Sequence, residues 1–345
     1  MGRSIVRLKD IADKTGFSTN TVSLALRESP RIPEPTRLLI RQAATELNYL
    51  PNQIAKSLVS RETRTIGLVL TDITNPTLTR VAQAIEVALS ERGYGTLFAT
   101  SNNTLSEEMR AIAMFRSRQV DGMLIYPTSH RKLDHIRPLR QANYPIVLLV
   151  GDPDAGIDAV CMDERRGAYK ASRHLIDMGH RRILHLAGRS DGFNGSQRLA
   201  GYRAALQAAG LAFDESLVLT VGYDPELAAT ALADYLQRLA PGTERPTAVF
   251  AATLVTAAGA LRTLHQCGFE LPRDFSVIAL NDGLLASLVF PQLTTVALHS
   301  AEMGSRAAAM LIDQIVDNQQ ARVEILQPGE LVVRGSVAPP PDLPA

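Results

Sequence analysis

Residues 8–26, LKDIADKTGFSTNTVSLAL, constrain the fold more than any other stretch, because they read as two short helices joined by a tight turn. The inward positions of the first helix recur at the helical spacing of three and four: Leu8, Ile11, Ala12 and Thr15. Gly16 can end that helix in the left-handed conformation, and Ser18 is a favourable N-cap for the second. A helix-turn-helix of this kind can place its second helix in the major groove of DNA.

The second helix has a core side and an open side. Val22 and Leu26 are expected to face the core. The residues that remain for the other sides of the helix are Thr19, Asn20, Thr21, Ser23 and Leu24. A small helical bundle that does not bind DNA would show the same pattern. The distribution of charge along the chain is a second observation that bears on DNA binding. Through Thr65 the chain has 11 Lys and Arg against 6 Asp and Glu, a net charge of +5; the whole chain has +1, which leaves −4 elsewhere. A small basic segment suits a polyanionic partner.

A third helix is predicted from Glu34, with an inward stripe made by Ile40, Ala43, Ala44 and Leu47. Residues 1–50 should therefore form a three-helix headpiece. Arg37 and Arg41 lie off the stripe and either contact phosphate or are solvated. Residues 51–64 follow as a hinge and linker, and PNQIAKSLV within them reads as one short helix. A helix of this length is marginal alone, so it either needs a partner, such as a symmetry mate and DNA, or is an ordinary linker.

From Thr65 the pattern changes to apolar strands that alternate with helix-length segments. The expected strands are residues 66–70, 96–99, 122–125, 146–150, 183–186, 217–221, 248–251, 277–280 and 294–298, with shorter runs at 323–326 and 330–333. Apolar strands with helical crossovers indicate parallel sheets covered on both faces. Two such series predict two subdomains, and ligands are expected in the cleft where the carboxyl ends of their strands meet.

The predicted fold class is thus an all-α helix-turn-helix domain followed by an α/β core of two doubly wound parallel-sheet subdomains, residues 65–337. Lobe 1 is expected to contain residues 65–162 and 293–321, the latter with a long helix at 301–318. Lobe 2 is expected to contain residues 163–292 and 322–337. The proline-rich tail, residues 338–345, is predicted to be disordered.

Composition and motifs exclude several classes of protein. The chain of 345 residues, 46% hydrophobic, can bury a large core; it shows no signal-peptide pattern and no apolar run of membrane length, so a cytoplasmic protein is expected. Cys161 and Cys267 are far apart and argue against a disulfide framework or a zinc cluster; both are expected to be buried thiols. No metal or other cofactor is expected.

An enzyme with a Rossmann-like core is one alternative, but the phosphate-binding, nucleophile-elbow and zinc-protease motifs are all missing from the sequence. His180 reads as a helix-end residue beside Gly179. We therefore predict no enzymatic activity and no catalytic residues. The second alternative is a solute-binding protein without a regulatory role, which explains two lobes but not the basic headpiece.

Many segments together resemble the bacterial transcription regulators of the lactose and purine repressor (LacI) family, from Val6 to Val337. The segments are LKDIADKTGFSTNTVSLAL, NYLPNQIAKSL, RTIGLVLTDITNP, RQVDGMLIYP, HLIDMGHRRILHLAG, QRLAGYRAAL, RPTAVFAA, LPRDFSVIALND, PQLTTV and ELVVRGS. The resemblance implies a DNA-binding headpiece, a hinge helix and a core similar to periplasmic sugar-binding proteins. It further implies a cytoplasmic homodimer, nucleoid-associated when bound to operator DNA, that senses a sugar or related metabolite and has no membrane partner.

The resemblance also assigns DNA contacts, which fall on Thr19, Asn20, Thr21, Ser23, Leu24, Asn52, Ala55 and Leu58. Leu24 departs from the family, which commonly has Arg or His there. Leucine can offer only an apolar contact, for example to a thymine methyl group, or it packs within the domain. Leu58 matches a hinge residue that wedges into the minor groove and kinks the duplex.

The effector site implied by the resemblance comprises Asp72, Leu78, Asp163, Phe193, Asn194, Arg198, Tyr223, Thr253 and Asn281. Arg198 matches the arginine that holds a sugar hydroxyl or an anionic effector, although it could instead form a salt bridge on a helix at 197–209. Phe193 and Asn194 match the loop before that helix, and Tyr223 matches an aromatic residue that can stack on a ring.

Three positions of this site depart from the family. Thr253-Leu254 stands in place of an Asn-Asp pair, Asn281 replaces an acidic residue, with Asp282 one step later, and Thr77 and Leu78 replace an aromatic pair. Fewer polar acceptors predict an effector less hydroxylated than a simple sugar, unless Asp72 and Asp163 supply acceptors.

Overall fold

The computed structural model describes residues 6–50, 62–151, 156–189, 192–239, 244–317 and 322–341. Its contacts divide the chain into two compact units, Met1–Thr63 and Arg64–Ala345. The predicted hinge helix, with Asn52, Ala55 and Leu58, lies outside the described residues. Within the described part of the chain, no helix has the length and apolar character needed to cross a membrane.

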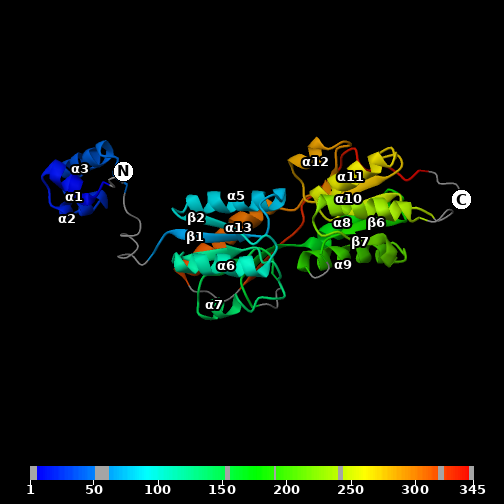
Figure 1. Ribbon diagram of the computed structural model, residues 1–345, viewed down its shortest axis with the longest axis horizontal. Helices are drawn as coiled ribbons and strands as arrows, with labels where there is room; N and C mark the ends of the chain where they lie inside the picture. The colour runs from blue at the N-terminus through cyan, green and yellow to red at the C-terminus, as the bar shows by residue number, and fades with distance from the viewer. Residues whose placement is uncertain are drawn as a thin grey trace. The chain divides into compact units, whose positions relative to one another are not determined.

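The first unit is a three-helix domain, shown in blue in Figure 1. Its helices are α1 (Leu8–Thr15), α2 (Thr19–Leu26) and α3 (Glu34–Glu46). Gly16 ends α1 at φ 74°, and the Ser18 hydroxyl accepts a hydrogen bond from the Thr21 amide at 3.1 Å. The bounds of α1 and α2 and both caps therefore confirm the prediction. The core of α2 is formed by Val22 and Ala25, whereas Leu26 is only half-buried.

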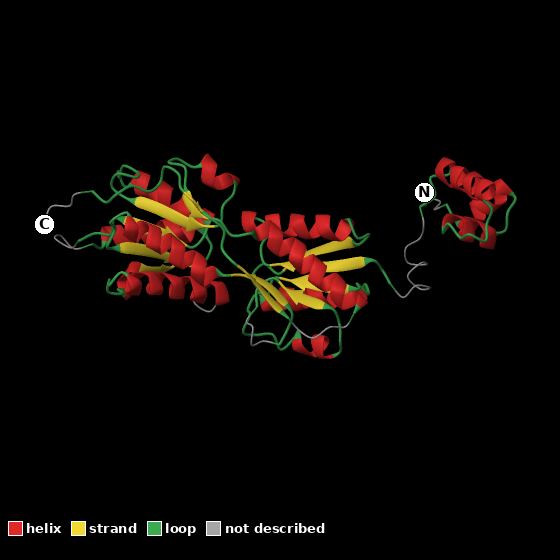
Figure 2. Ribbon diagram, turned by 180° about the vertical axis from the view of Figure 1, so that it is seen from behind, coloured by secondary structure: helices red, strands yellow, loops and turns green. Residues whose placement is uncertain are grey.

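Lobe 1 of the second unit is built on a six-stranded sheet with the order β11-β5-β4-β3-β1-β2, in which all neighbouring strands pair in parallel. Its strands are β1 (Thr65–Leu70), β2 (Gly95–Thr100), β3 (Gly122–Ile125), β4 (Ile146–Leu148), β5 (Ala159–Met162) and β11 (Val323–Leu326). Its helices are α5 (Pro76–Ser90), α6 (Leu105–Ser117), α7 (Arg137–Gln141) and α13 (Ser300–Val316). Helices α5 and α13 pack on one face of the sheet and α6 on the other, so both faces are buried (Figure 2).

Lobe 2 has a second six-stranded sheet, with the order β12-β10-β9-β8-β6-β7, in which only β12 pairs antiparallel. Its strands are β6 (Ile183–Ala187), β7 (Val218–Thr220), β8 (Ala248–Ala251), β9 (Ser276–Leu280), β10 (Thr294–Val296) and β12 (Leu331–Val332). Its helices are α8 (Glu164–Asp177), α9 (Phe193–Ala208), α10 (Pro225–Gln237), α11 (Leu254–Gln266) and α12 (Leu284–Leu288), with a short 3-10 turn at Glu215–Leu217. Helices α8 and α9 cover one face, and α10 and α11 cover the other.

Two strands lie in the opposite lobe to the one predicted. β10 pairs with β9 through Thr294 and Ile278, so it belongs to lobe 2. β11 pairs with β5 through Val323 and Ala159, so it belongs to lobe 1. The chain therefore crosses between the lobes after β5, after β10 and after β11. The predictions failed because each strand is a short apolar run, and its own sequence does not specify which distant strand it pairs with.

Residues 159–162, which form β5, were not predicted as a strand, because four residues beside unpatterned loop sequence give little periodicity. The cysteines are both free, and Cys161 in β5 is buried as expected. Cys267 is exposed at the end of α11, contrary to the expectation of a buried thiol.

The C-terminal segment was predicted to be disordered from residue 338, but residues 338–341 are described and pack on lobe 2. The Ala338 amide donates to the Ser276 hydroxyl at 3.0 Å, and the Ala338 carbonyl lies 2.9 Å from His180 Nε2. The His180 ring is buried and also bonds the Thr247 hydroxyl at 2.8 Å, and its burial lowers its pKa. His180 is thus an anchor for the C-terminal segment rather than a simple helix-end residue.

We expect a chain that ends at Val337 to be less stable than the full chain. It would lose the Ala338 carbonyl and amide, and the buried groups of His180 and Ser276 would lose a partner, which should lower the free energy of unfolding by about 1–3 kcal/mol. Urea denaturation measures this difference. A chain that ends at Pro341 keeps these contacts and should match the full chain; equal loss in both truncations would contradict the assignment.

Candidate functional site

The open face of α2 lies at the amino end of that helix. Thr19 and Asn20 are exposed, whereas Thr21, Ser23 and Leu24 are half-buried. The Thr21 hydroxyl lies 2.9 Å from the Ser18 hydroxyl and so takes part in the N-cap. Leu24 lies outside the headpiece core cluster. The most accessible polar groups of α2 are therefore those of Thr19 and Asn20.

The basic side chains of the headpiece are held by acidic neighbours. Arg37 forms an ion pair with Glu34, and its Nη1 also donates to the Glu28 carbonyl at 3.3 Å. Arg41 pairs with the Glu28 carboxylate. Both arginines are thus ion-paired in the free protein. The sequence analysis predicted either a phosphate contact or a solvated side chain, and it did not predict these ion pairs.

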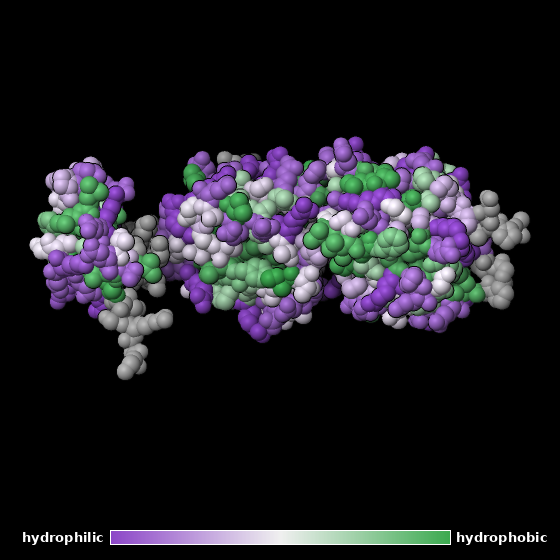
Figure 3. Space-filling model, turned by 90° about the horizontal axis from the view of Figure 1, so that it is seen from above, coloured by the Kyte–Doolittle hydropathy of each residue, from purple (hydrophilic) through white to green (hydrophobic). Residues whose placement is uncertain are grey.

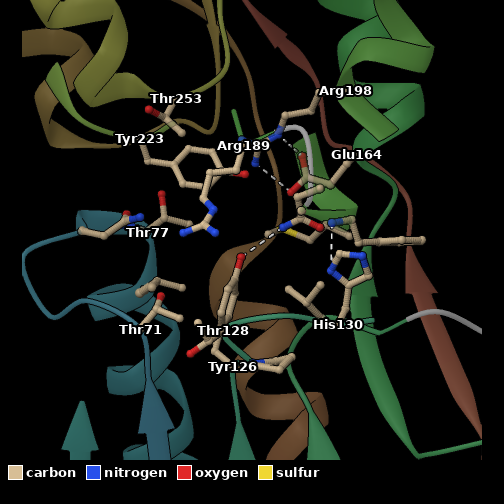
Figure 4. A pocket seen from close by; sticks show the side chains of 18 of the residues that line it. Thr71, Thr77, Tyr126, Thr128, His130, Glu164, Arg189, Arg198, Tyr223 and Thr253 are labelled. Carbon is tan, nitrogen blue, oxygen red and sulfur yellow. Dashed lines mark hydrogen bonds and ion pairs between the residues drawn. The ribbon is translucent and has the colours of Figure 1, made fainter. Parts of the chain in front are cut away.

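A cavity lies between the two lobes of the second unit, at the carboxyl ends of the strands (Figure 4). The predicted effector residues that line it are Leu78, Phe193, Asn194, Arg198, Tyr223, Thr253 and Asn281. Lining residues that the sequence prediction missed include Thr71, Asn75, Asn103, Tyr126, Thr128, His130, Glu164, Arg189 and Met303. Thr71 and Tyr126 follow directly after β1 and β3, so for these two a polar residue just beyond an apolar run was the signal that could have found them.

Asp72 and Asp163 are not among the residues that line the cavity, so the prediction for them is not supported. The Asp72 carboxylate accepts hydrogen bonds from the amide and hydroxyl of Thr74, at 2.8 and 2.7 Å. Asp163 caps α8 by accepting from the Arg166 amide at 2.9 Å. Both carboxylates are thus used in turns. Among the described lining residues, the one that carries a carboxylate is Glu164, one residue beyond Asp163.

Arg198 and Glu164 form a buried, two-pronged ion pair. Arg198 is only 4% exposed; its Nε lies 2.8 Å from Oε2 of Glu164 and its Nη2 lies 2.9 Å from Oε1. The salt bridge connects α9 to α8, and Arg198 also lines the cavity, so both functions considered for this residue coexist. Burial alone would lower the pKa of Arg198, but the Glu164 carboxylate raises it above its ordinary value. Nη1 of Arg198 has no hydrogen-bond partner among the described residues.

Hydrogen bonds between described residues join the lobes beside the cavity. Asn194 Nδ2 donates to the Tyr126 hydroxyl at 3.0 Å, and the Phe193 amide donates to His130 Nδ1 at 2.9 Å. Arg80 Nη1 donates to the backbone carbonyl of Asp282 at 2.9 Å. A change in lobe position would therefore break bonds that also shape the cavity.

The helix that carries Arg198 begins earlier than predicted. α9 begins at Phe193, so Phe193 and Asn194 are its first two residues rather than part of a preceding loop. Its amino end therefore lies at the cavity wall. The sequence prediction began the helix at Gln197 because Gly192 and Gly195 weaken the helical pattern before that residue.

Comparison with known proteins gives matches to both units. The family described as "Bacterial regulatory proteins, lacI family" matches residues 7–52, and "Periplasmic binding protein-like domain" matches residues 172–337. The HTH-type transcriptional regulator DegA of Bacillus subtilis is 31% identical over 96% of this chain and 97% of its own. The HTH-type transcriptional repressor PurR of Proteus mirabilis is 31% identical over 97% of each chain. The HTH-type transcriptional regulator CelR of Thermobifida fusca is 33% identical over 95% of this chain and 97% of its own.

Solved structures agree with these relatives. A CelR–cellobiose complex has a TM-score of 0.73 and 31% identity, and the match covers 96% of this chain and 100% of that one. A lac repressor dimer bound to operator and an anti-inducer has a TM-score of 0.86 over 96% and 99% of the chains, with 23% identity, which shows the fold. The relatives are transcriptional regulators rather than enzymes or simple solute-binding proteins. The chain therefore belongs to the LacI family of bacterial transcriptional regulators.

Proposed function

We propose that this protein is a homodimeric transcriptional repressor whose affinity for one operator is set by a small effector bound between its lobes. The observation that carries the proposal is the exposed amino end of α2, with Thr19 and Asn20, in a domain with the capped geometry of a helix-turn-helix. Base edges in the major groove are read by side chains at this end of a recognition helix. We propose Thr21, Ser23, Leu24 and the hinge residues Asn52, Ala55 and Leu58 as further contacts.

A dimer is favoured by the surface of the core as well as by kinship with a repressor that was crystallised as a dimer on operator. Figure 3 shows apolar side chains gathered on one face of both lobes. Exposed apolar residues of the helices and the segment after α12 include Val87, Leu227, Leu284, Leu288 and Phe290. Contiguous exposed apolar surface often marks a protein contact. Two headpieces would read half-sites of a pseudo-palindrome about one helical turn, roughly 34 Å, apart.

The proposed effector is a sugar or a related metabolite. CelR binds cellobiose, and a family member from Enterococcus faecium was solved with ribose. In this chain the ligand would contact the residues that line the cavity, with Arg198 and Asn281 as buried polar partners. By changing the hydrogen bonds between the lobes it would shift operator affinity, and coupling of this kind is typically about 1–3 kcal/mol. A regulator of chromosomal genes acts in the cytoplasm, in association with the nucleoid when bound.

The test is selection of genomic fragments from the source organism by the purified full chain, at fixed near-physiological salt, with and without a metabolite panel. Salt is fixed because phosphate contacts make affinity steeply salt-dependent. Enrichment of one palindromic site, changed by one compound, is the expected result. Equal recovery of all fragments under every condition would contradict the proposal.

Replacing Asn20 with alanine should reduce operator discrimination. A lost base contact is worth about 1–3 kcal/mol, roughly 5- to 150-fold in operator affinity, while binding to nonspecific DNA should be unchanged. Titration of both DNAs by fluorescence anisotropy measures this. Thr45→Ala on α3 is the control, because the Thr45 hydroxyl bonds only the Arg41 carbonyl of its own helix. An equal loss on both DNAs would identify Asn20 as a phosphate contact instead.

Replacing Arg198 with methionine should both destabilise the core and abolish the effector response. The change leaves the Glu164 carboxylate buried without its partner, and breaking a buried pair in this way typically lowers the free energy of unfolding by about 3–5 kcal/mol. Adding Glu164→Gln removes the isolated charge and should restore much of the stability without restoring the response. Urea denaturation gives the stabilities; a single variant as stable as wild type would contradict this account of the pair.

A further inference from the structure

A carboxylate lies on the buried face of α6, where the helical pattern favours an apolar side chain. Ala111, Ile112 and Phe115 form this face at the spacing of three and four, and Glu108 occupies the position one turn earlier. Glu108 is 0% exposed. Burial of a carboxylate is costly unless hydrogen bonds replace its lost hydration, so the partners of Glu108 show what it does.

Both oxygens of Glu108 hold the segment between β3 and α7, residues 126–136, which we call the β3–α7 loop. The Thr128 amide donates to Oε2 of Glu108 at 2.5 Å, and His135 Nε2 lies 2.6 Å from Oε1. Thr128 is held a second time, because its hydroxyl donates to the buried Ser101 hydroxyl at 3.0 Å. One carboxylate on α6 thus fixes this loop near both of its ends.

The same loop reaches across to lobe 2. The Tyr126 hydroxyl accepts from Asn194 Nδ2 at 3.0 Å, and His130 Nδ1 accepts from the Phe193 amide at 2.9 Å. The ring centroids of His130 and Phe193 also lie 5.2 Å apart. In Figure 4 the Tyr126 and His130 side chains extend from lobe 1 toward these partners. The β3–α7 loop is therefore part of the contact that joins the lobes.

The Phe193 amide reports directly on this contact. Phe193 is the first residue of α9, and the first amides of a helix have no carbonyl partner within that helix. The partner that the described structure gives this amide is His130, in the other lobe. Protection of the Phe193 amide from exchange with water therefore depends on whether the lobes are joined at this point.

Glu108 and His135 act on the contact from behind, because neither is among the described residues that line the cavity. His130 lies between Thr128 and His135 in the sequence, so the two bonds of Glu108 bracket the residue that reaches across. A loop that is already fixed loses less conformational entropy when it bonds the other lobe.

We propose that Glu108 is a positioning residue for the contact between the lobes. By fixing the β3–α7 loop in lobe 1, its carboxylate lowers the entropic cost of the bonds that Tyr126 and His130 make to α9, and so favours the joined arrangement of the lobes. The effect of this on operator affinity rests on the proposed function, whereas the effect on the lobe contact does not.

The test is amide hydrogen exchange of the full-length protein with no ligand added, followed at the Phe193 amide by NMR. Glu108→Leu should raise the exchange rate of this amide about tenfold or more, as expected when a stabilising hydrogen bond is lost. The Val221 amide is the internal reference, because it donates to the Ala187 carbonyl at 3.0 Å within lobe 2. A role of Glu108 in the stability of lobe 1 alone would lower the melting temperature and leave exchange at Phe193 unchanged relative to Val221.

Three further variants isolate the hydrogen bonds of Glu108. Glu107→Leu is the matched control on the same helix, because the Glu107 carboxylate pairs with Arg110 at 2.9 Å, and exchange at Phe193 should match wild type. Glu108→Gln keeps the shape of the side chain; its carbonyl can accept from the Thr128 amide and its amide group can donate to His135, so most of the protection should remain. His135→Leu removes one of the two bonds and should raise exchange by less than Glu108→Leu, which keeps the test available if Glu108→Leu does not fold.

Wild-type exchange at Phe193 in both Glu108→Leu and His135→Leu would overturn the proposal, and so would equally fast exchange in Glu107→Leu and Glu108→Leu. Operator affinity of the same variants at fixed salt should differ from wild type by about fivefold or more where exchange is raised. Raised exchange with unchanged operator affinity would refute the link from lobe position to DNA, which belongs to the proposed function. Exchange at Phe193 decides the role of Glu108 even if the wild-type protein selects no operator.

Discussion

Parallel strand pairing is the constraint on which the rest of the core depends. A parallel sheet needs a crossover after each strand, and helices in these crossovers place their amino ends at the edge where the strands end. Both lobes direct this edge to the same cavity, so the residues that follow some of the strands line it. Thr71 follows β1, Tyr126 follows β3 and Asn281 follows β9 in this way. The location of the site thus follows from the direction in which the strands of both lobes run.

The buried ion pair of Arg198 and Glu164 makes this site sensitive to small displacements. Glu164 lies just after β5, where the chain first crosses from lobe 1 to lobe 2, and Arg198 lies on α9, whose first residues bond lobe 1. A pair in a low-dielectric interior is stabilising only when its geometry is good. A ligand that moves either partner would therefore also act on the crossing segment, which connects binding chemistry to the relative position of the lobes.

Local sequence signals predicted much of the fold. The helices of the headpiece and strands such as residues 122–125 and 248–251 were placed correctly, because capping residues and apolar runs act over a few positions. The lobes of β10 and β11 were wrong, because pairing depends on distant strands. The sequence predicted a ligand cavity at the carboxyl ends of the strands, and it predicted Arg198 as one of the residues of that cavity. Asp72 and Asp163 were predicted and Glu164 was not, because the orientation of a carboxylate after a strand depends on the turn or helix that it caps.

The ion pairs of the headpiece have a consequence for its thermodynamics on DNA. Lys14, Arg37 and Arg41 are each within an ion pair with a glutamate of the same domain, at Glu46, Glu34 and Glu28 respectively. These carboxylates act as internal counterions. A phosphate that takes their place displaces a tethered carboxylate, which then attracts a mobile cation of its own, so the net release of mobile ions that makes affinity depend on salt concentration is smaller. Part of the basic character of this domain is therefore balanced from within, and the salt dependence expected of its binding to DNA is weaker than its number of lysines and arginines alone would give.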